Sequence, residues 1–276
     1  MTKIGIVTDS SCDLPADVVR RHGIDVVPLT VRFGDEVLTD GIELSSADFW
    51  QRLGGTRDLP ETAAPSPGAF LEAFTRAEDV DGIVCLCLST QLSGTYQAAV
   101  LAAEEAPIPV KVVDSGVVSL ALGLVAVEAA VAAAAGHKLE EVAAVASEAA
   151  SRANVFAALD TLEFLERGGR VGRVSAILGG LLDIKPLITL DAGVVAAAGR
   201  VRTQLRAAAA VADHLAGRTV ARYGLIHSGA AAVPRLIEAI AERTSLAVDD
   251  PIVAELGPVV GTHTGPGVLG AAYLEA

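Results

Sequence analysis

The chain has 276 residues, of which 51% are hydrophobic and 20% are charged, and this composition excludes an extensively disordered protein. The length is sufficient for two packed α/β units. The formal net charge of -13 gives a surface that repels nucleic-acid phosphates and anionic lipids, so we expect no nucleic acid as a partner and at most transient membrane contact. The three cysteines, Cys12, Cys85 and Cys87, are expected to be reduced core residues.

Strand-like and helix-like segments alternate through the first half of the chain. Four apolar runs are typical of buried strands: 3–8, 25–31, 82–88 and 110–114. A segment with helical spacing follows each of the first three runs, at 15–23, 45–53 and 93–105. The alternation predicts an α/β fold with a mainly parallel N-terminal sheet that has helices on both faces. Because the chain opens on a strand without a signal-peptide pattern, we expect a cytoplasmic protein.

Two later segments of the N-terminal half also allow a prediction. Ser66 followed by Pro67 is typical of a helix start, so residues 59–65 are expected to form a loop. The apolar segment 116–136 is long enough to cross a bilayer. It contains Glu128 and is rich in alanine, however, so a buried core helix is the better prediction.

The pattern changes near residue 153, where short strands begin around a turn at 191–193 and alternate with further helices. We therefore expect two lobes, an N-terminal one over 1–153 and a C-terminal α/β lobe with a mixed sheet over 154–276. The loop and helix at 60–80 are candidates for packing with the C-terminal lobe. A crevice between lobes is a common place for a ligand.

Four polar clusters stand in predicted loops or at strand ends, at 8–15, 60–67, 88–97 and 261–267. The first and third follow parallel strands, so we expect them at the same edge of one sheet, where ligands bind in α/β folds. Asp9 and Ser10 either contact a ligand or cap the helix that starts near Pro15. Ser93 is a candidate helix cap, and the helix start beside it could also hold an anion.

The histidines differ in their surroundings. His263 lies in the glycine-rich loop 261–267, and a functional and a structural role are about equally supported. His227, at the end of a predicted strand, is a weaker candidate. The other three are expected to be solvated residues in or beside helices: His22, His137 and His214.

A short basic stretch stands out in this acidic chain. Arg167, Arg170 and Arg173 surround a pair of glycines that would end the preceding helix. The stretch is either a solvated turn or, together with Lys185, Arg200 and Arg202, a basic face for a phosphorylated or acidic partner. The sequence has no phosphate-binding loop, dinucleotide fingerprint, nucleophile elbow or His/Cys metal spacing.

In this order, the polar clusters resemble the motifs of the DegV family, the bacterial fatty-acid-binding proteins. The matching strings follow the family's order and are spread over nearly the whole chain: VTDSSCDLP, LSTQLSGTYQ, DSGVVSLALG, LEFLERGGRVGR, IKPLI and HTGPG. The resemblance implies a carrier that binds one long-chain fatty acid in an apolar tunnel, without catalytic residues, metal or cofactor. It further implies that a separate dihydroxyacetone-kinase-like fatty acid kinase phosphorylates the carboxylate with ATP and that the acyl-phosphate enters phospholipid synthesis.

The resemblance also implies roles for individual residues. The carboxylate would be bound by Thr62, Ser93, Gly94, His263 and Thr264. The supporting polar residues would be Asp9, Ser10 and Thr95. The kinase and its phosphates would face Arg170, Arg173 and Arg202.

This chain departs from the family pattern at three positions. Ala63 and Ala64 replace a serine and a glutamine, so Thr62 is the only matching hydroxyl before Pro65. Ala121 replaces a glycine and should only tighten local packing.

Two other functions compete with the carrier. A hydrolase of lipid esters would use Ser93 and His263 with Asp9 or Asp114, and it requires an acid behind the histidine. A phosphocarrier would instead accept a phosphate on His263.

Overall fold

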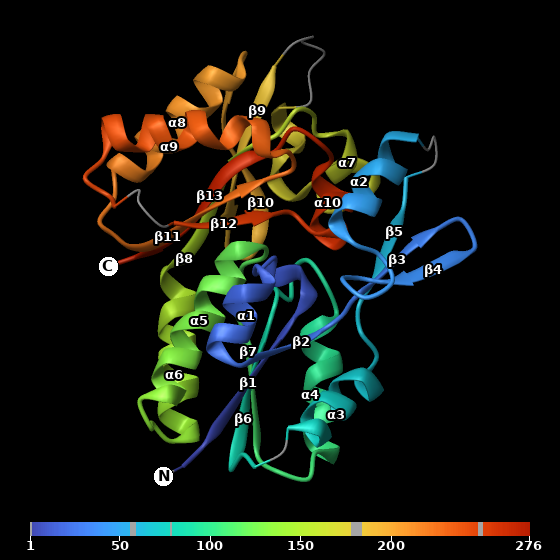
Figure 1. Cartoon of the computed structure of the whole chain (residues 1–276). Helices are drawn as coiled ribbons and strands as arrows, with labels where there is room; N and C mark the ends of the chain where they lie inside the picture. The colour runs from blue at the N-terminus through green and yellow to red at the C-terminus, as the bar shows by residue number, and fades with distance from the viewer. Residues whose placement is uncertain (1, 56–58, 78, 178–183, 248–250) are drawn as a thin grey trace.

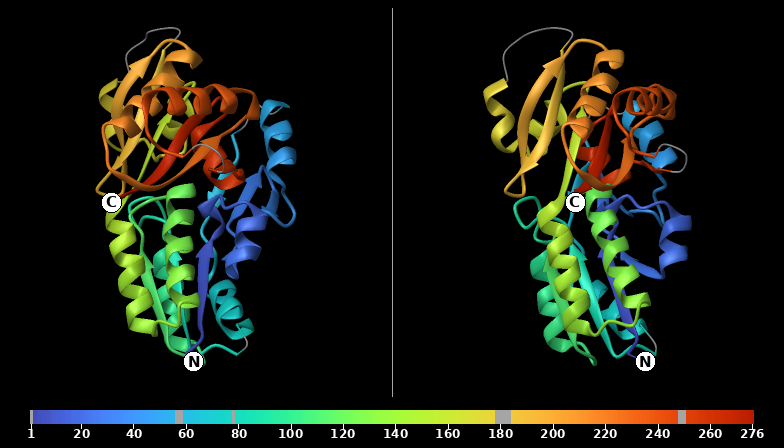
Figure 2. Two further views of the ribbon diagram at one scale, coloured as in Figure 1. Left: turned by 60° about the vertical axis from the view of Figure 1, so that its left-hand side comes forward. Right: turned by 90° about the vertical axis from the view of Figure 1, so that its left-hand side faces the viewer.

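The computed structural model describes the chain except residues 1, 56–58, 78, 178–183 and 248–250. The chain forms two lobes stacked end to end (Figures 1 and 2). The N-terminus lies at the far end of the first lobe, and the C-terminus lies where the lobes meet. Residues before about 153 build the first sheet and residues after it build the largest sheet.

The first lobe contains a four-stranded parallel sheet in the order β2-β1-β6-β7. Its strands are β1 (Ile4–Asp9), β2 (Ile24–Val27), β6 (Gly82–Cys87) and β7 (Val110–Asp114). One face is covered by α1 (Ala16–His22), α5 (Leu120–Ala134) and α6 (Leu139–Arg152). The other face is covered by α3 (Pro67–Arg76) and α4 (Thr95–Glu105). The predicted parallel sheet with helices on both faces is confirmed, and Cys85 and Cys87 are buried free thiols in it.

A small antiparallel sheet, which the sequence pattern did not predict, lies beside the first lobe. The expected strand at 25–31 is two strands, because Pro28 has no N–H with which to continue the ladder after Val27. The second part joins a sheet of order β4-β3-β5, formed by β3 (Thr30–Phe33), β4 (Glu36–Thr39) and β5 (Glu61–Ala63). The helix α2 (Ser46–Gly55) packs on this sheet. The expected loop at 59–65 therefore contains a strand.

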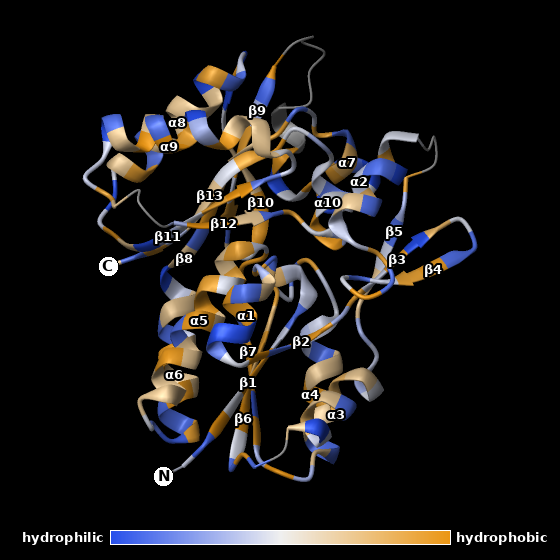
Figure 3. Cartoon of the chain, in the orientation of Figure 1, coloured by the Kyte–Doolittle hydropathy of each residue, from blue (hydrophilic) through white to orange (hydrophobic). Residues whose placement is uncertain are grey.

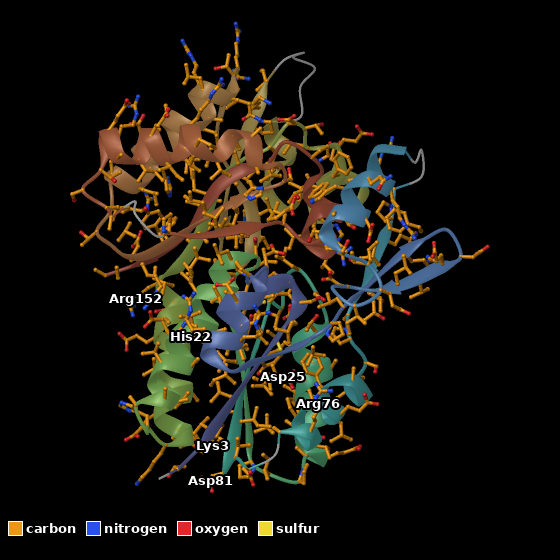
Figure 4. All side chains as sticks on the ribbon, viewed as in Figure 1. Lys3, His22, Asp25, Arg76, Asp81 and Arg152 are labelled. Carbon is orange, nitrogen blue, oxygen red and sulfur yellow. The ribbon has the colours of Figure 1, made fainter. Side chains whose placement is uncertain are left out.

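Helix α3 belongs to the N-terminal lobe. It starts as predicted, because the Ser66 Oγ accepts a hydrogen bond from the Ala69 N–H at 3.2 Å and Pro67 is the first helical residue. It buries Phe70 and Phe74 against the parallel sheet. At its end, Arg76 points toward Asp25 of β2 (Figure 4), with 3.1 Å between guanidinium nitrogen and carboxylate oxygen. Of the loop and helix at 60–80 that were candidates for packing with the C-terminal lobe, the helix packs on the N-terminal sheet, whereas Thr62 of the loop contacts His263 of the C-terminal lobe.

The second lobe is built on a six-stranded mixed sheet in the order β10-β9-β8-β13-β11-β12, in which β11 and β12 alone are a parallel pair. Its strands are β8 (Ala153–Ala158), β9 (Lys185–Asp191), β10 (Val194–Val201), β11 (Val220–His227), β12 (Ile252–Glu255) and β13 (Leu269–Glu275). Its helices are α7 (Glu163–Arg167), α8 (Gln204–Ala216), α9 (Val233–Arg243) and α10 (Pro258–Thr264). The 3-10 turns of the chain are η1 (Ser10–Cys12), η2 (Gly172–Ile177) and η3 (Ala230–Ala232).

The six-stranded sheet is covered by helices of both lobes. Helices α8 and α9 cover its outer face, with His214 of α8 stacked on Phe156 at 3.8 Å between ring centroids. His214 is thus half-buried, not solvated as expected. Helix α5 of the first lobe covers part of the inner face (Figure 3). A Cβ at Gly123 would lie only 2.8 Å from the Cys12 carbonyl oxygen, so this glycine lets α5 approach residues 12–14 of the first lobe closely.

Eleven of the 15 residues of α5 are buried, among them Ala121. The apolar segment at 116–136 is therefore a core helix, as its alanine content predicted. In the part of the chain that the structure describes, no helix combines the length and the hydropathy of a membrane span.

Candidate ligand-binding site

A cavity lies between the inner face of the six-stranded sheet and the adjoining edge of the first lobe. Most of its lining is apolar. Alternate residues of the sheet supply one wall, because successive side chains of a strand point to opposite faces. This wall is formed by Val155, Ala157, Ile188, Leu190, Val195 and Ile226. The first lobe supplies the opposite wall with Leu88, Leu92 and Val118.

Polar side chains line the same cavity from five separate segments of the chain. They are Thr62, Ser93, Ser119, Arg170, His263 and Thr264. Three of the four predicted polar clusters thus contribute a lining residue, and the arginine comes from the basic stretch. An apolar cavity with a few convergent polar groups is the usual form of a small-molecule site.

Thr62 and His263 meet across the two lobes. Thr62 lies on β5 opposite Val31, and its Oγ1 is 2.9 Å from the Nε2 of His263. His263 is in the last turn of α10, where Gly168 of the basic stretch packs against its ring. Burial and, to a smaller extent, the charge of Arg170 lower the pKa of His263 to about 4. The imidazole is therefore neutral at physiological pH.

The second nitrogen of His263 has no hydrogen-bond partner among the residues that the structure describes. Its Nδ1 is buried and makes no hydrogen bond. Gly168 packs against this atom, where an added Cβ would overlap it, and leaving a buried polar atom unpaired is costly. Next to it, the Thr264 hydroxyl donates to the Val260 carbonyl at 3.0 Å and is already committed to its own helix.

The Ser93 loop follows β6 and leads into α4. The Ser93 Oγ lies 2.9 Å from the Thr95 Oγ1 and accepts a hydrogen bond from the Thr95 N–H at 3.3 Å. Gly94 is the N-cap residue of α4 and has no side chain to satisfy the first helical N–H groups. Ser93 lines the cavity, Thr95 is buried and Gly94 is exposed. The structure therefore brings Ser93 into the cavity wall, to which Gly94 and Thr95 do not contribute.

The three arginines predicted to face a kinase do not lie together in one environment. Arg170 lines the cavity and is held by the Leu92 and Gly168 carbonyls, at 3.3 and 2.7 Å. Arg173 is exposed and forms an ion pair with Asp191. Arg202 is exposed beyond the end of β10. Arg170 is therefore the arginine that places positive charge beside the cavity.

Asp9 and Ser10 support the site from outside the cavity lining. Asp9 accepts hydrogen bonds from the Ser11 N–H at 3.0 Å and the Leu88 N–H at 2.8 Å. This confirms that the clusters at 8–15 and 88–97 meet at one sheet edge. Burial raises the pKa of Asp9 to about 6. Ser10 accepts a hydrogen bond from the Leu29 N–H at 3.0 Å. Asp9 caps η1, whereas Pro15 is the N-cap residue of α1 without a side-chain cap.

Sequence reasoning missed two residues of the site. Ser119 lines the cavity, although in the sequence it was only one letter of a longer string. Gly168 was explained as a helix end, yet a Cβ there would overlap His263 and lie 3.0 Å from the Phe164 carbonyl oxygen. Both roles depend on contacts with residues far away in the sequence. The φ of -73° at Gly168 is open to any residue, so the backbone conformation does not require glycine there. The contact with His263 requires it.

The hydrolase geometry does not fit the hydrogen bonds of the described residues. The Ser93 hydroxyl is paired with Thr95, and the His263 Nε2 is paired with Thr62. The His263 Nδ1, where an orienting carboxylate would bind, has no partner. Asp114 is engaged with the Thr90 hydroxyl at 2.6 Å. Within the described ranges, no three His, Cys, Asp or Glu side chains form a group able to hold a metal ion.

The fold and the cavity define a two-lobed α/β protein with an internal apolar site that has polar groups on part of its wall. The chain belongs to the DegV family, because residues 3–276 match the family model described as "Uncharacterised protein, DegV family". A DegV domain-containing protein of Streptomyces coelicolor is 42% identical over 272 residues, which cover 97% of this chain and 96% of the relative.

Solved structures agree with this assignment. A DegV family protein from Thermus thermophilus, described with fatty acid binding, matches with a TM-score of 0.91 and 37% identity, and the match covers 100% of both chains. DegV from Bacillus subtilis, described as a fatty acid binding protein, matches with a TM-score of 0.84 and 28% identity over 100% of both chains. The predicted family and fold class are thereby confirmed.

Proposed function

We propose that this protein binds a long-chain fatty acid, with the acyl chain in the apolar part of the cavity and the carboxylate at its polar residues. The observation that carries the proposal is one cavity with an apolar wall from both lobes and with Thr62, Ser93 and His263 among its polar groups. The fatty acids described for the relatives from Thermus thermophilus and Bacillus subtilis support the same ligand class.

The chemistry of the polar groups suits a carboxylate. The hydroxyls of Thr62 and Ser93 can donate hydrogen bonds, and a neutral imidazole donates from one of its two nitrogens. Arg170 supplies a positive charge in a protein whose formal net charge is -13. In this proposal Thr264 and the backbone of Gly94 flank the head group, while Asp9, Ser10 and Thr95 hold the surrounding loops.

The acyl chain would supply most of the affinity. Burying ~14 methylene groups at ~0.8 kcal/mol each gives ~11 kcal/mol of favourable transfer free energy. Association removes roughly 4–15 kcal/mol of this for lost translational and rotational freedom. The contacts of the carboxylate therefore decide orientation more than affinity.

We further propose that the protein is a carrier without turnover of its own. A dihydroxyacetone-kinase-like fatty acid kinase would phosphorylate the bound carboxylate in the cytoplasm, and the acyl-phosphate would enter phospholipid synthesis. The family resemblance supports this step. The exposed Arg173 and Arg202 remain candidates for contact with the kinase or its nucleotide.

Native mass spectrometry of the protein purified from a bacterial host tests the binding step. A stoichiometric fatty acid, identified after organic extraction, is the expected result. A ligand-free protein that also fails to take up added palmitate or oleate would overturn the proposal. The carrier step is tested by incubating the loaded protein with ATP and a candidate kinase and measuring acyl-phosphate, with the protein alone as control.

A further inference from the structure

The carboxylate of Asp13 joins three parts of the chain that are far apart in sequence. Asp13 lies between η1 and α1, with a left-handed φ of 49°. One of its oxygens accepts a hydrogen bond from the Ser119 hydroxyl at 2.5 Å, and the other accepts one from the Gly257 N–H at 2.9 Å. Neither bond belongs to a helix or strand ladder. The residue contributes nothing to the cavity lining, so its effect on the site must act through these two partners.

The first partner is part of the cavity wall. Ser119 lines the cavity and is the N-cap residue of α5. Its φ of 61° and ψ of -153° form a backbone conformation that is strained for any residue except glycine. Such a conformation persists only where the surroundings enforce it. The hydrogen bond to Asp13 is part of these surroundings.

The second partner begins the helix that carries His263. Gly257 is the N-cap residue of α10, and α10 has no side-chain cap of its own. Asp13 therefore supplies from the N-terminal lobe the acceptor for the N-cap N–H, which in a capping box is supplied by the side chain at N3. Six residues later, His263 pairs with Thr62. The middle of the same helix is seated on α2, where a Cβ at Gly261 would lie 2.9 Å from the Trp50 ring.

We propose that Asp13 is a positioning residue for the ligand head group, because it holds the Ser119 wall and the start of α10 so that His263 faces the cavity beside Thr62. The inference rests on the proposed binding of a fatty acid in this cavity. Burial of the Asp13 carboxyl group raises its pKa to about 7, with smaller contributions from Asp40 and Asp9.

Two substitutions of Asp13 separate its hydrogen bonds from its charge. Asp13→Ala removes both bonds. Asp13→Asn keeps an acceptor oxygen for the Gly257 N–H and has an amide that can donate to the Ser119 hydroxyl. The matched control is Asp17→Ala, which removes an exposed carboxylate paired with Arg21 on the neighbouring helix α1.

Two readouts report the head-group site directly. In ligand-free protein, the imidazole ¹⁵N resonances of His263, assigned with the His263→Gln variant, report its pairing with Thr62. In loaded protein, the ¹³C resonance of carboxyl-labelled palmitate reports the environment of the head group. We expect Asp13→Ala to move both resonances and to weaken palmitate binding at least tenfold. Asp13→Asn should return the resonances to the wild-type positions and the affinity to within threefold, and Asp17→Ala should change none of them.

A folded Asp13→Ala variant with wild-type resonances and affinity would overturn the inference. Failure of Asp13→Asn to rescue the resonances would do the same. If Asp13→Ala does not fold, Ser119→Ala removes one bond alone, and unchanged palmitate binding and resonances in that variant would count against the proposal. If wild-type protein binds no palmitate, the proposed function fails, whereas the ¹⁵N comparison of ligand-free variants still decides whether Asp13 positions His263.

Discussion

Gly168→Ala should disturb the head-group site by a single methyl group. The φ of -73° and ψ of -7° at Gly168 are favourable for alanine, so the substitution introduces no backbone strain. The added Cβ would overlap the His263 ring at Nδ1 and lie 3.0 Å from its Cε1 and from the Phe164 carbonyl oxygen. Because the backbone oxygen cannot yield easily, the histidine must move away. Its 2.9 Å pairing with the Thr62 hydroxyl would then be lost.

The size of the effect follows from three contributions. Forcing a methyl group into a packed site costs about 1–3 kcal/mol of unfolding free energy. Replacing glycine by alanine at a compatible position returns about 0.4–1 kcal/mol through the unfolded state. We therefore expect Gly168→Ala to lose ~1–2 kcal/mol of stability. Loss of one head-group hydrogen bond, worth about 0.5–1.5 kcal/mol, weakens palmitate binding by up to about tenfold.

The matched control is Gly217→Ala. Gly217 is also a helix C-cap residue, with a φ of -78° and a ψ of 4°, and the nearest atoms to an added Cβ are 3.7 Å away. This variant should keep wild-type affinity and gain up to about 1 kcal/mol of stability. Urea unfolding and calorimetric titration with palmitate measure both quantities. Equal stability and affinity in the two variants would refute the reasoning that contact with His263 dictates glycine at 168.

Three further predictions concern the cavity wall and two buried titrating groups, His263 and Asp40. Ala157→Phe should fill the apolar part of the cavity and abolish palmitate uptake in a titration. The control Ala197→Phe, on an exposed part of β10, should bind palmitate as wild type does. Equal uptake by the two variants would mean that the acyl chain lies elsewhere. The ¹⁵N resonances of His263 in ligand-free protein should keep neutral-imidazole positions from about pH 8 to about pH 5, because burial lowers its pKa to about 4, and a titration midpoint near 6.5 would contradict this cause. Burial raises the pKa of Asp40 to about 6, so the folded state binds its proton more tightly than the unfolded chain and stability from this group is lost as pH rises from about 4 to about 6. Relative to wild type, Asp40→Asn should therefore gain up to about 3 kcal/mol of unfolding free energy between about pH 4 and about pH 7, and a pH-independent difference in urea unfolding would contradict it.

The predicted strands of the parallel sheet are the part of the fold that could be read from the sequence most directly. Runs such as 82–88 are apolar at every position because both faces of the strand are covered, and this pattern depends on neighbours in sequence alone. The three-stranded sheet was not predicted, because it depends on residues that are distant in sequence. Its strands are three or four residues long and are stabilised by partners as distant as Val31 and Thr62.

The candidate site was predicted in part. Ser93 and His263 were identified from polar strings in predicted loops, and both line the cavity. Arg170 was predicted to face a kinase and its phosphates, and the structure places it in the cavity wall. A basic stretch shows that positive charge is present. The direction in which each side chain points is set by the packing of α7 and the loop after it.

Periodicity and motif spacing are properties of neighbouring residues, and they were enough to predict the α/β class, the two-lobed organisation, the buried helix at 116–136 and the order of polar loops that identifies the family. Which of those polar residues meet could be seen only in the folded chain. Thr62 and His263 are 201 positions apart, and Asp13 and Gly257 are 244 apart. Contacts over such separations form only when both lobes are folded and docked, because they depend on the packing of whole helices and sheets against one another.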